Sequence, residues 1–237
     1  MGDVHLIVQR KAGTGKTTIA TFLADYLIQR QRPGGSLLVL DTDTAHASLS
    51  RFPGLQARLV APAELTDVLV PHRGDAVIDG GPEAHAAIMD HLRDDQTLPR
   101  LAQAGHALTV HCVVVGGGAQ DDSLANLLDS IRTLPPSIRL IVWLNDYFGE
   151  IVSPTGQPFD KMRVYAEHHH RLFGLVTLRA RHNTMFGRAL QDMLKEGMTF
   201  TEAVPSPEFF IMERQRLVMM QREIAGLLDL VLLPNDL

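Results

Sequence analysis

Residues 4–18 have the sequence VHLIVQRKAGTGKTT, and this segment is the strongest indication of the fold in the chain. An apolar run, Val4 to Val8, leads into a glycine-containing loop and then into a segment with helical periodicity. Gly13 and Gly15 let the backbone bend so that successive N–H groups point at phosphate oxygens. The start of a helix adds its partial positive charge at the same place. The segment therefore predicts a phosphate-binding loop between a strand and a helix.

Two side chains of this loop have a predicted chemical role. Lys16 can reach the β- and γ-phosphates of a nucleotide, and the Thr17 hydroxyl can ligate Mg²⁺. The other nucleotide contacts are expected from the remaining loop residues, which are Ala12, Gly13, Thr14, Gly15 and Thr18. The sequence thus predicts a nucleotide site that uses Mg²⁺.

Further apolar runs recur along the chain and predict the remaining strands. They are Ser36–Leu40, Ala76–Ile78, Thr109–Val115, Ile138–Leu144 and Leu172–Leu178. These runs are apolar on both faces, as strands buried between two helix layers are. The segments between them have helical character, most clearly Thr17–Gln31 and Asp121–Thr133. Strand alternating with helix predicts a doubly wound α/β fold, with a mainly parallel sheet and helices on both faces.

The chain length favours a single domain over residues 1–237. With 237 residues, 45% of them hydrophobic, the chain can build one sizeable core, and no Ser/Gly-rich or strongly charged linker divides it. From Pro207 to about Leu230 the pattern predicts one long C-terminal helix. We expect this helix to pack on the sheet domain. The alternative is an amphipathic helix that binds a partner or a membrane surface.

Charge and cysteine content narrow the classes of protein. The formal net charge of −5 gives no support to bulk electrostatic binding of nucleic acid, although a local basic patch stays open. The single cysteine, Cys112, lies in an apolar run and is expected to be a buried hydrophobic residue in a reducing compartment. No apolar stretch approaches the roughly 20 residues needed to cross a bilayer. The sequence also lacks a signal-peptide pattern, so we expect a cytoplasmic protein.

Acidic residues follow two of the predicted strands. Asp41 and Asp43 come after Ser36–Leu40, and Asp79 ends the short run at 76–78, just before Gly80 and Gly81. Residues just past the carboxyl end of a parallel strand face the ligand crevice. Asp79 is therefore expected to hold the Mg²⁺ shell through water, as a hard cation prefers, and the two glycines to form a turn that senses the γ-phosphate. Taken alone, each segment also fits an ordinary solvated turn.

The strand at 138–144 ends in Asn145. Its side-chain amide can read the edge of an adenine base, but an asparagine at this place fits a turn or a helix cap equally well. The Asn-Lys-x-Asp pattern of many GTPases is missing here. We therefore expect ATP rather than GTP.

The phosphate loop departs from the common pattern Gly-x-x-x-x-Gly-Lys-[Ser/Thr], because Arg10 stands at its first position. It fits Lys-x-Gly-x-Gly-Lys-Thr instead, with Lys11 as the additional lysine. This is the deviant Walker A loop of the ParA/MinD family of ATPases, and the chain resembles that family. The resemblance implies a P-loop NTPase fold and an ATPase that forms a homodimer in the ATP state.

The resemblance also implies roles for individual residues. Lys11 would reach across the dimer and neutralise charge on the partner's nucleotide, much as an arginine finger does. Asp43 would position the attacking water, and Asp41 would support either Mg²⁺ or the loop. The chain departs from the family at Ala12, where glycine is usual, and at Thr44, where proline is usual.

Within this family the chain most resembles the TraL-type proteins of plasmid conjugation systems, in its length, its N-terminal loop strand without a leading extension and its compact C-terminal region. That resemblance implies a switch that positions a protein or DNA cargo for a type IV secretion apparatus. It also implies slow intrinsic ATP turnover, because such ATPases complete their sites by dimerisation.

Three other functions are alternatives to this interpretation of the sequence. One is a plasmid or chromosome partitioning ATPase that binds DNA nonspecifically, and another is a metabolic ligase of the dethiobiotin synthetase type. The third is a membrane switch like MinD, which is disfavoured because residues 234–237 contain no lysine or arginine.

Overall fold

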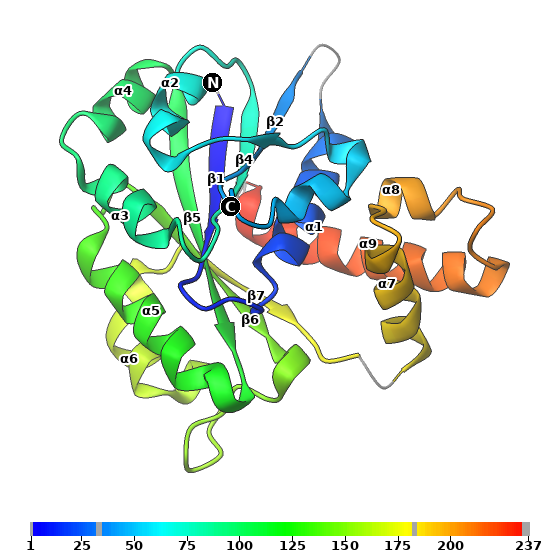
Figure 1. Ribbon diagram of the computed structural model, residues 1–237. Coiled ribbons are helices and arrows are strands. Elements are labelled where there is room, and N and C mark those ends of the chain that lie inside the picture. Colours follow the sequence, from blue (N-terminus) through cyan, green and yellow to red (C-terminus); the bar gives the residue numbers. More distant parts are fainter. Residues whose placement is uncertain (1, 32–34, 182–183, 234–237) are drawn as a thin grey trace.

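A seven-stranded sheet runs through the molecule, with helices against both of its faces (Figure 1). The computed structural model describes residues 2–31, 35–181 and 184–233. Residues 234–237, which bear on the membrane alternative, lie outside the described residues. The strands are β1 (Gly2–Val8), β2 (Leu37–Asp41), β3 (Arg58–Leu59), β4 (Asp75–Asp79), β5 (His106–Val115), β6 (Arg139–Asn145) and β7 (Gly174–Leu178).

The strand order is β3-β2-β4-β1-β5-β6-β7, and every neighbouring pair is parallel. The predicted doubly wound α/β fold is confirmed, and each of the six predicted strands is present within a few residues of its expected bounds. Only β3 was not predicted. It has two residues, both exposed, so it leaves no apolar run in the sequence.

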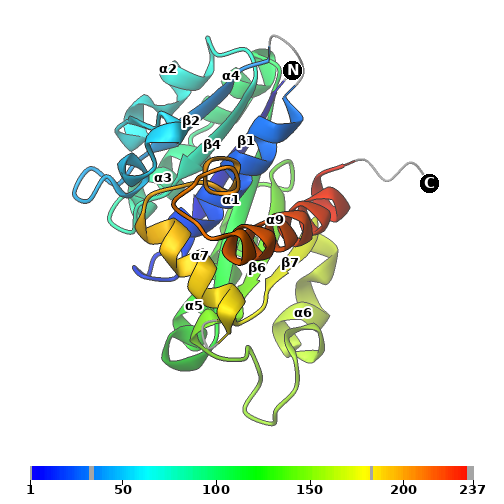
Figure 2. The same ribbon diagram turned by 90° about the vertical axis from the view of Figure 1, so that its right-hand side faces the viewer.

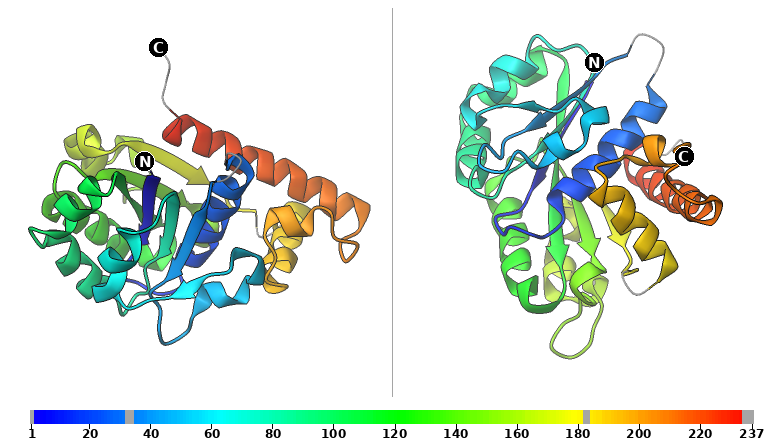
Figure 3. Two further views of the ribbon diagram at one scale, coloured as in Figure 1. Left: turned by 90° about the horizontal axis from the view of Figure 1, so that it is seen from above. Right: turned by 45° about the vertical axis from the view of Figure 1, so that its right-hand side comes forward.

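The helices form two layers that cover opposite faces of the sheet (Figures 1 and 3). One layer contains α2 (Leu65–Leu69), α3 (His85–Arg93), α4 (Thr97–Gln103), α5 (Gln120–Thr133) and α6 (Arg163–His168). The other contains α1 (Lys16–Arg30), α7 (Met185–Lys195), α8 (Phe200–Ala203) and α9 (Ile211–Leu232). Among the described residues, no helix has the length and apolar character that crossing a membrane requires.

β1 illustrates why the strands are apolar on both faces. Leu6 and Val8 belong to the core beneath α2–α6, whereas Ile7 belongs to the core beneath α1 and α7–α9. All three side chains are buried. Because burying a large aliphatic side chain stabilises a fold by about 1.5–3 kcal/mol, both faces of the sheet contribute to stability.

The register of the central strands brings three carboxyl ends together at one edge of the sheet. β1 lies between β4 and β5, and Ile7 of β1 pairs with Asp79 of β4. β2 pairs with β4 on the other side, so that Asp41 is opposite Asp79. The loop after β1 therefore starts next to Asp79, and Asp41 lies one strand further along the same end of the sheet.

The C-terminal helix expected from about residue 207 begins at Ile211. The chain before it turns so that Phe209 enters the core, and Glu213 then accepts a hydrogen bond from the Phe210 backbone N–H at 2.8 Å. Buried residues of α9 pack it against α1, α7, α8 and β7. Figure 2 shows α9 lying across the outside of this layer.

A buried polar chain links three central strands and was not predicted. The Trp143 indole N–H donates to His111 Nδ1 at 2.9 Å, and His111 Nε2 lies 3.0 Å from His5 Nδ1. Since an indole only donates, His111 Nδ1 must accept, so the neutral ring carries its proton on Nε2 and donates to His5. Burial lowers the pKa of His5 to about 4 and that of His111 well below its ordinary value.

This chain of histidines predicts loss of stability in acid. The unfolded chain protonates His5 near pH 6.5, whereas the folded chain resists protonation until about pH 4. The contribution is therefore complete above pH 6.5 and is lost as the pH falls, by about 3 kcal/mol for His5. Denaturant titrations of the free energy of unfolding between pH 7 and pH 4 measure it.

His5→Gln keeps an acceptor for His111 but does not titrate, so its stability should fall less steeply with pH than that of the wild type. His170→Gln, at an exposed histidine, is the matched control and should follow the wild type. Equal slopes for all three proteins would contradict a role for the buried pair.

Candidate functional site

The loop between β1 and α1 has the backbone conformation expected of a phosphate-binding loop. Gly13 and Gly15 have φ angles of 73° and 93°, which side chains other than glycine rarely adopt. A Cβ on Gly15 would also lie 2.8 Å from the Asn145 side-chain nitrogen, whereas the space beside Gly13 is open to 4 Å. The two glycines are thus required for different reasons, one by backbone alone and one by backbone and crowding.

Lys16 is the first residue of α1 and its side chain is buried. Its ammonium group donates to the Lys11 carbonyl oxygen at 3.0 Å, so it lies folded over the loop. Burial lowers the pKa of Lys16, and the charges of Asp79 and Asp43 oppose that shift. The cation is therefore already placed at the loop, among the carboxylates of the site.

Asp79 at the end of β4 is joined to the start of α1. The Thr17 hydroxyl donates to Asp79 Oδ2 at 2.6 Å. The second carboxylate oxygen, Oδ1, is buried and makes no hydrogen bond within the described part of the chain. Burial raises the pKa of Asp79 to about 6, although the Thr17 hydrogen bond and Lys16 oppose the shift. A buried acceptor without a donor is costly, and oxygen ligands of this kind suit the hydrated shell of Mg²⁺.

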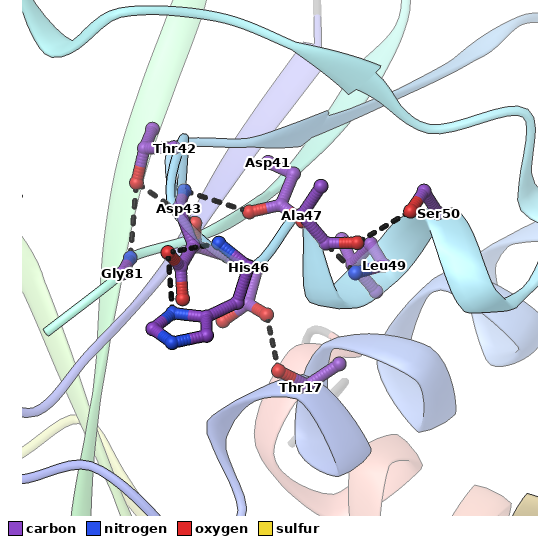
Figure 4. Close-up of polar contacts among 10 residues, drawn as sticks. Thr17, Asp41, Thr42, Asp43, His46, Ala47, Leu49, Ser50 and Gly81 are labelled. Carbon is purple, nitrogen blue, oxygen red and sulfur yellow. Dashed lines mark hydrogen bonds and ion pairs between the residues drawn. The ribbon is translucent and has the colours of Figure 1, made fainter.

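Asp41 uses both carboxylate oxygens to hold the loop that follows β2 (Figure 4). Oδ1 accepts from the Asp43 N–H at 2.8 Å, and Oδ2 accepts from the Leu49 N–H at 2.9 Å. Of the two roles left open for Asp41, this geometry favours support of the loop over a Mg²⁺ contact.

The loop after β2 is also tied to the turn after β4. The Thr42 hydroxyl donates to the Asp79 carbonyl oxygen and accepts from the Gly81 N–H, both at 3.0 Å (Figure 4). A Cβ on Gly81 would lie 2.8 Å from the Asp43 Cα. Asp43 is buried, and its Oδ1 accepts from the His46 N–H at 3.0 Å. The loop that contains Asp43 and the turn expected to sense the γ-phosphate are therefore in direct contact.

Asn145 holds the phosphate loop from the other side. Its side-chain N–H donates to the Thr14 carbonyl oxygen at 3.0 Å, and its side-chain oxygen accepts from the Tyr147 N–H at 3.3 Å. Of the two roles left open for Asn145, these bonds favour the cap of a turn. Support of the loop is an additional role that the sequence did not indicate, because Thr14 and Asn145 are 131 residues apart.

Lys11 lies on the surface beside α5. Its ammonium group is 2.7 Å from Asp122 Oδ2, and the two side chains are 43% and 66% exposed. The neighbouring Arg10 makes a similar pair with Asp129 at 3.3 Å. Ion pairs this exposed contribute little to stability, so Lys11 can exchange its carboxylate partner for another anion at small cost.

A cavity of about 520 Å³ adjoins the phosphate loop. It extends from Gly13 and Gly15 to the inner side of α7 and α9. Arg179 and Arg181 contribute to its wall. No sequence pattern marked this set as the lining of one cavity, which also includes Phe22, Tyr147, Leu190, Gln191, Glu223 and Leu227. A cavity of this size beside the loop is large enough for the base and ribose of a nucleotide whose phosphates bind the loop, as the sequence predicts.

Comparisons with known proteins place the chain among relatives of similar length. No protein-family model matches it. Two curated relatives, each named Protein TraL and each from Escherichia coli, are 30% and 28% identical over 240 residues, and each alignment covers 97% of this chain and 98% of the relative. They confirm the predicted resemblance to TraL-type proteins.

Two solved structures also align with most of the chain. One is the MinD cell division protein of Aquifex aeolicus, with a TM-score of 0.45, 14% identity and coverage of 95% of this chain and 98% of that one. The other is a plasmid partition protein from Borrelia burgdorferi, with a TM-score of 0.37, 13% identity and coverage of 82% and 96%. With TM-scores and identities this low, the two alignments do not bear on the fold or the function of the chain.

The contacts of Asn145 predict how its removal affects nucleotide binding. Asn145→Ala deletes the bond to the loop carbonyl, so the affinity for ATP and for GTP should fall by the same factor, about five- to tenfold. Calorimetric titrations of both nucleotides measure the two factors. Asp146→Ala, in the same turn but without a bond to the loop, is the matched control. A loss confined to ATP would show instead that Asn145 reads the adenine base.

Proposed function

The chain belongs to the family of the TraL proteins, and on that premise we propose that it is a Mg²⁺-dependent ATPase that acts as a dimerising switch in plasmid conjugation. The observation that carries the proposal is the bond between Thr17 and Asp79 beside the phosphate loop, with the second Asp79 oxygen buried and without a hydrogen-bond donor among the described residues. The roles expected for Lys16 and Thr17, contact with the nucleotide phosphates and with Mg²⁺, are compatible with this position of Asp79.

The nucleotide phosphates would bind the backbone N–H groups from Ala12 to Thr18 and the Lys16 ammonium group. Thr17 and Asp79 would hold Mg²⁺, Thr17 through its hydroxyl and Asp79 through water. When bound, the ion neutralises charge that develops on the transferred phosphoryl group. Lys16 needs little rearrangement, because its ammonium group already lies over the loop.

Asp43 would position the water that attacks the γ-phosphate. Its carboxylate is buried beside the turn at Gly81, and the Asp41 side chain fixes its backbone N–H. A carboxylate can accept hydrogen bonds from water and so orient it for an in-line attack. The hydrogen bond from the Gly81 N–H to the Thr42 hydroxyl would couple the position of the Asp43 carboxylate to that of the turn after β4.

Lys11 would complete the site of a second subunit. In the single chain it pairs with Asp122 at the surface. In the ATP-bound dimer it would exchange that carboxylate for phosphate oxygens of the opposite nucleotide. Hydrolysis removes this anionic partner, which favours separation of the subunits.

The nucleotide state has a route to the C-terminal helices. The segment after Leu49 packs tightly against the turns around α8: a Cβ on Gly197 would lie 1.9 Å from the Arg51 carbonyl oxygen, and one on Gly54 would lie 2.1 Å from a Glu202 carboxylate oxygen. Movement of the loop after β2 would therefore shift α7–α9, and a conjugation partner that binds there would sense ATP. The cargo would be a protein or DNA.

The two lysines of the loop should fail in different ways. Lys16→Ala removes the phosphate contact within the chain and should abolish ATP binding. Lys11→Ala should leave ATP affinity within about twofold, since its group acts in the second subunit, but should prevent dimerisation. Calorimetry measures the affinity. Light scattering with Mg²⁺ and a nonhydrolysable ATP analogue measures the mass, at a protein concentration where the nucleotide-free chain is monomeric.

Arg10→Ala is the matched control, because Arg10 is the neighbouring surface cation and also pairs with α5. It should keep both ATP binding and the doubling of mass. Equal loss of affinity in the two lysine variants would refute the role of Lys11 across the dimer. A wild type that binds ATP and stays monomeric would refute the switch.

A further inference from the structure

The outer face of α9 is apolar and has no cover within the described chain. Ile211, Met212, Met219 and Leu230 have exposed fractions of 68%, 62%, 58% and 72%. Figure 2 shows the helix at the outside of the molecule. Single exposed apolar residues are common on proteins, but Met212, Met219 and Leu230 lie within about 20° of one another around this 22-residue helix and form a stripe that suggests an interface.

This stripe points away from the nucleotide site. The opposite side of α9 contributes Met220, Ile224 and Leu227 to the cavity beside the phosphate loop. Leu217 and Leu228 are fully buried in the core on that side as well. An interaction on the outer face therefore leaves the phosphate loop free.

We propose that the outer face of α9 pairs with the same face of a second copy of this chain. The two helices would run antiparallel about a two-fold axis at Met219. In such an interface residue i meets residue j of the second copy, and j meets i in return. Residues equally far before and after Met219 must therefore complement one another.

The shapes along the helix meet this requirement. Met212 and Gly226 lie seven residues before and after Met219, so each Met212 would lie over Gly226 of the second copy. The space around Gly226 is open, since a Cβ placed there meets no atom within 4 Å. A small residue at a contact point lets two helices approach closely. Each large side chain would thus fill a hollow, and the two Met219 side chains would meet at the axis.

The charges at the edges of the face also match. Residues seven apart lie within about 20° of each other around a helix, so Arg216 and Glu223 share one edge, and Gln215 and Arg222 share the other. Antiparallel pairing brings Arg216 next to Glu223 of the second copy. It likewise brings Gln215 next to Arg222. Glu223 also accepts from Arg181 within its own chain, and a carboxylate has room for both donors.

These complements favour a second copy of the chain over an unrelated partner. The hollow at Gly226 and the side chain that fills it are on the same helix, and so are the cation and the anion. The pairing requires no nucleotide and no contact from Lys11, so it is independent of the proposed ATP-dependent dimer. An experiment can therefore refute the pairing of α9 while the ATP-dependent dimer stands.

Engineered cysteines test the register directly. The native Cys112 is fully buried, so an added cysteine is the reactive one. Met219→Cys should form a disulfide-linked dimer on mild oxidation without nucleotide. Leu230→Cys is the matched control, because it is at least as exposed but lies eleven residues from the axis. Its two copies would be about 33 Å apart at 1.5 Å per residue, so it should not cross-link.

The free association of the chain is tested with Gly226→Leu. Leucine is a better helix former than glycine and the site is open, so this variant should fold, which circular dichroism checks. It closes the hollow for Met212 and should raise the dissociation constant by about tenfold or more in nucleotide-free light scattering over a concentration series. A wild type that is monomeric throughout, a Gly226→Leu protein that associates as the wild type does, or equal cross-linking at positions 219 and 230 would overturn the proposal.

Discussion

The hydrogen bond from the Thr17 hydroxyl to Asp79 joins the two elements on which the site depends, the start of α1 and the end of β4. It exists because β1 and β4 pair in parallel, with Ile7 opposite Asp79, so that both strands end at the same edge of the sheet. Within the part of the chain that the structure describes, the second oxygen of this buried carboxylate has no donor beside the phosphate loop. In the proposed function, Mg²⁺ with its water would supply this oxygen with the donor that it lacks.

A series of short contacts connects Asp79 with the loop after β2 and, through that loop, with the C-terminal helices. Thr42 ties the loop after β2 to the Asp79 carbonyl and to Gly81, and Asp41 fixes the same loop through two backbone N–H groups. The end of this loop packs against the turns around α8. In the proposed cycle the γ-phosphate acts at one end of this series and a partner at the other. The outer face of α9 is a separate surface, because its inner face lies against the cavity beside the phosphate loop.

The features that could be predicted from the sequence are those that depend on the pattern of neighbouring residues. Residues apolar on both faces identified six strands, and the spacing of Gly13 and Gly15 before Lys16 identified the loop. What it missed depends on residues far apart in the chain. The second role of Asn145 needs the Thr14 carbonyl, and the hydrogen-bonded chain of His5, His111 and Trp143 joins three strands. The choice between loop and metal for Asp41 likewise rests on a bond to Leu49, which no spacing rule indicates.

The most direct test of the account is the effect of Mg²⁺ on ATP binding in the wild type and in Asp79→Asn, measured by calorimetry with and without the ion. Asparagine keeps an acceptor for Thr17 but lacks the negative charge that attracts the cation. We predict that Mg²⁺ strengthens ATP binding to the wild type and has little effect on the variant. The same increase in both proteins would contradict it, because Asp79 would then have no part in holding the ion.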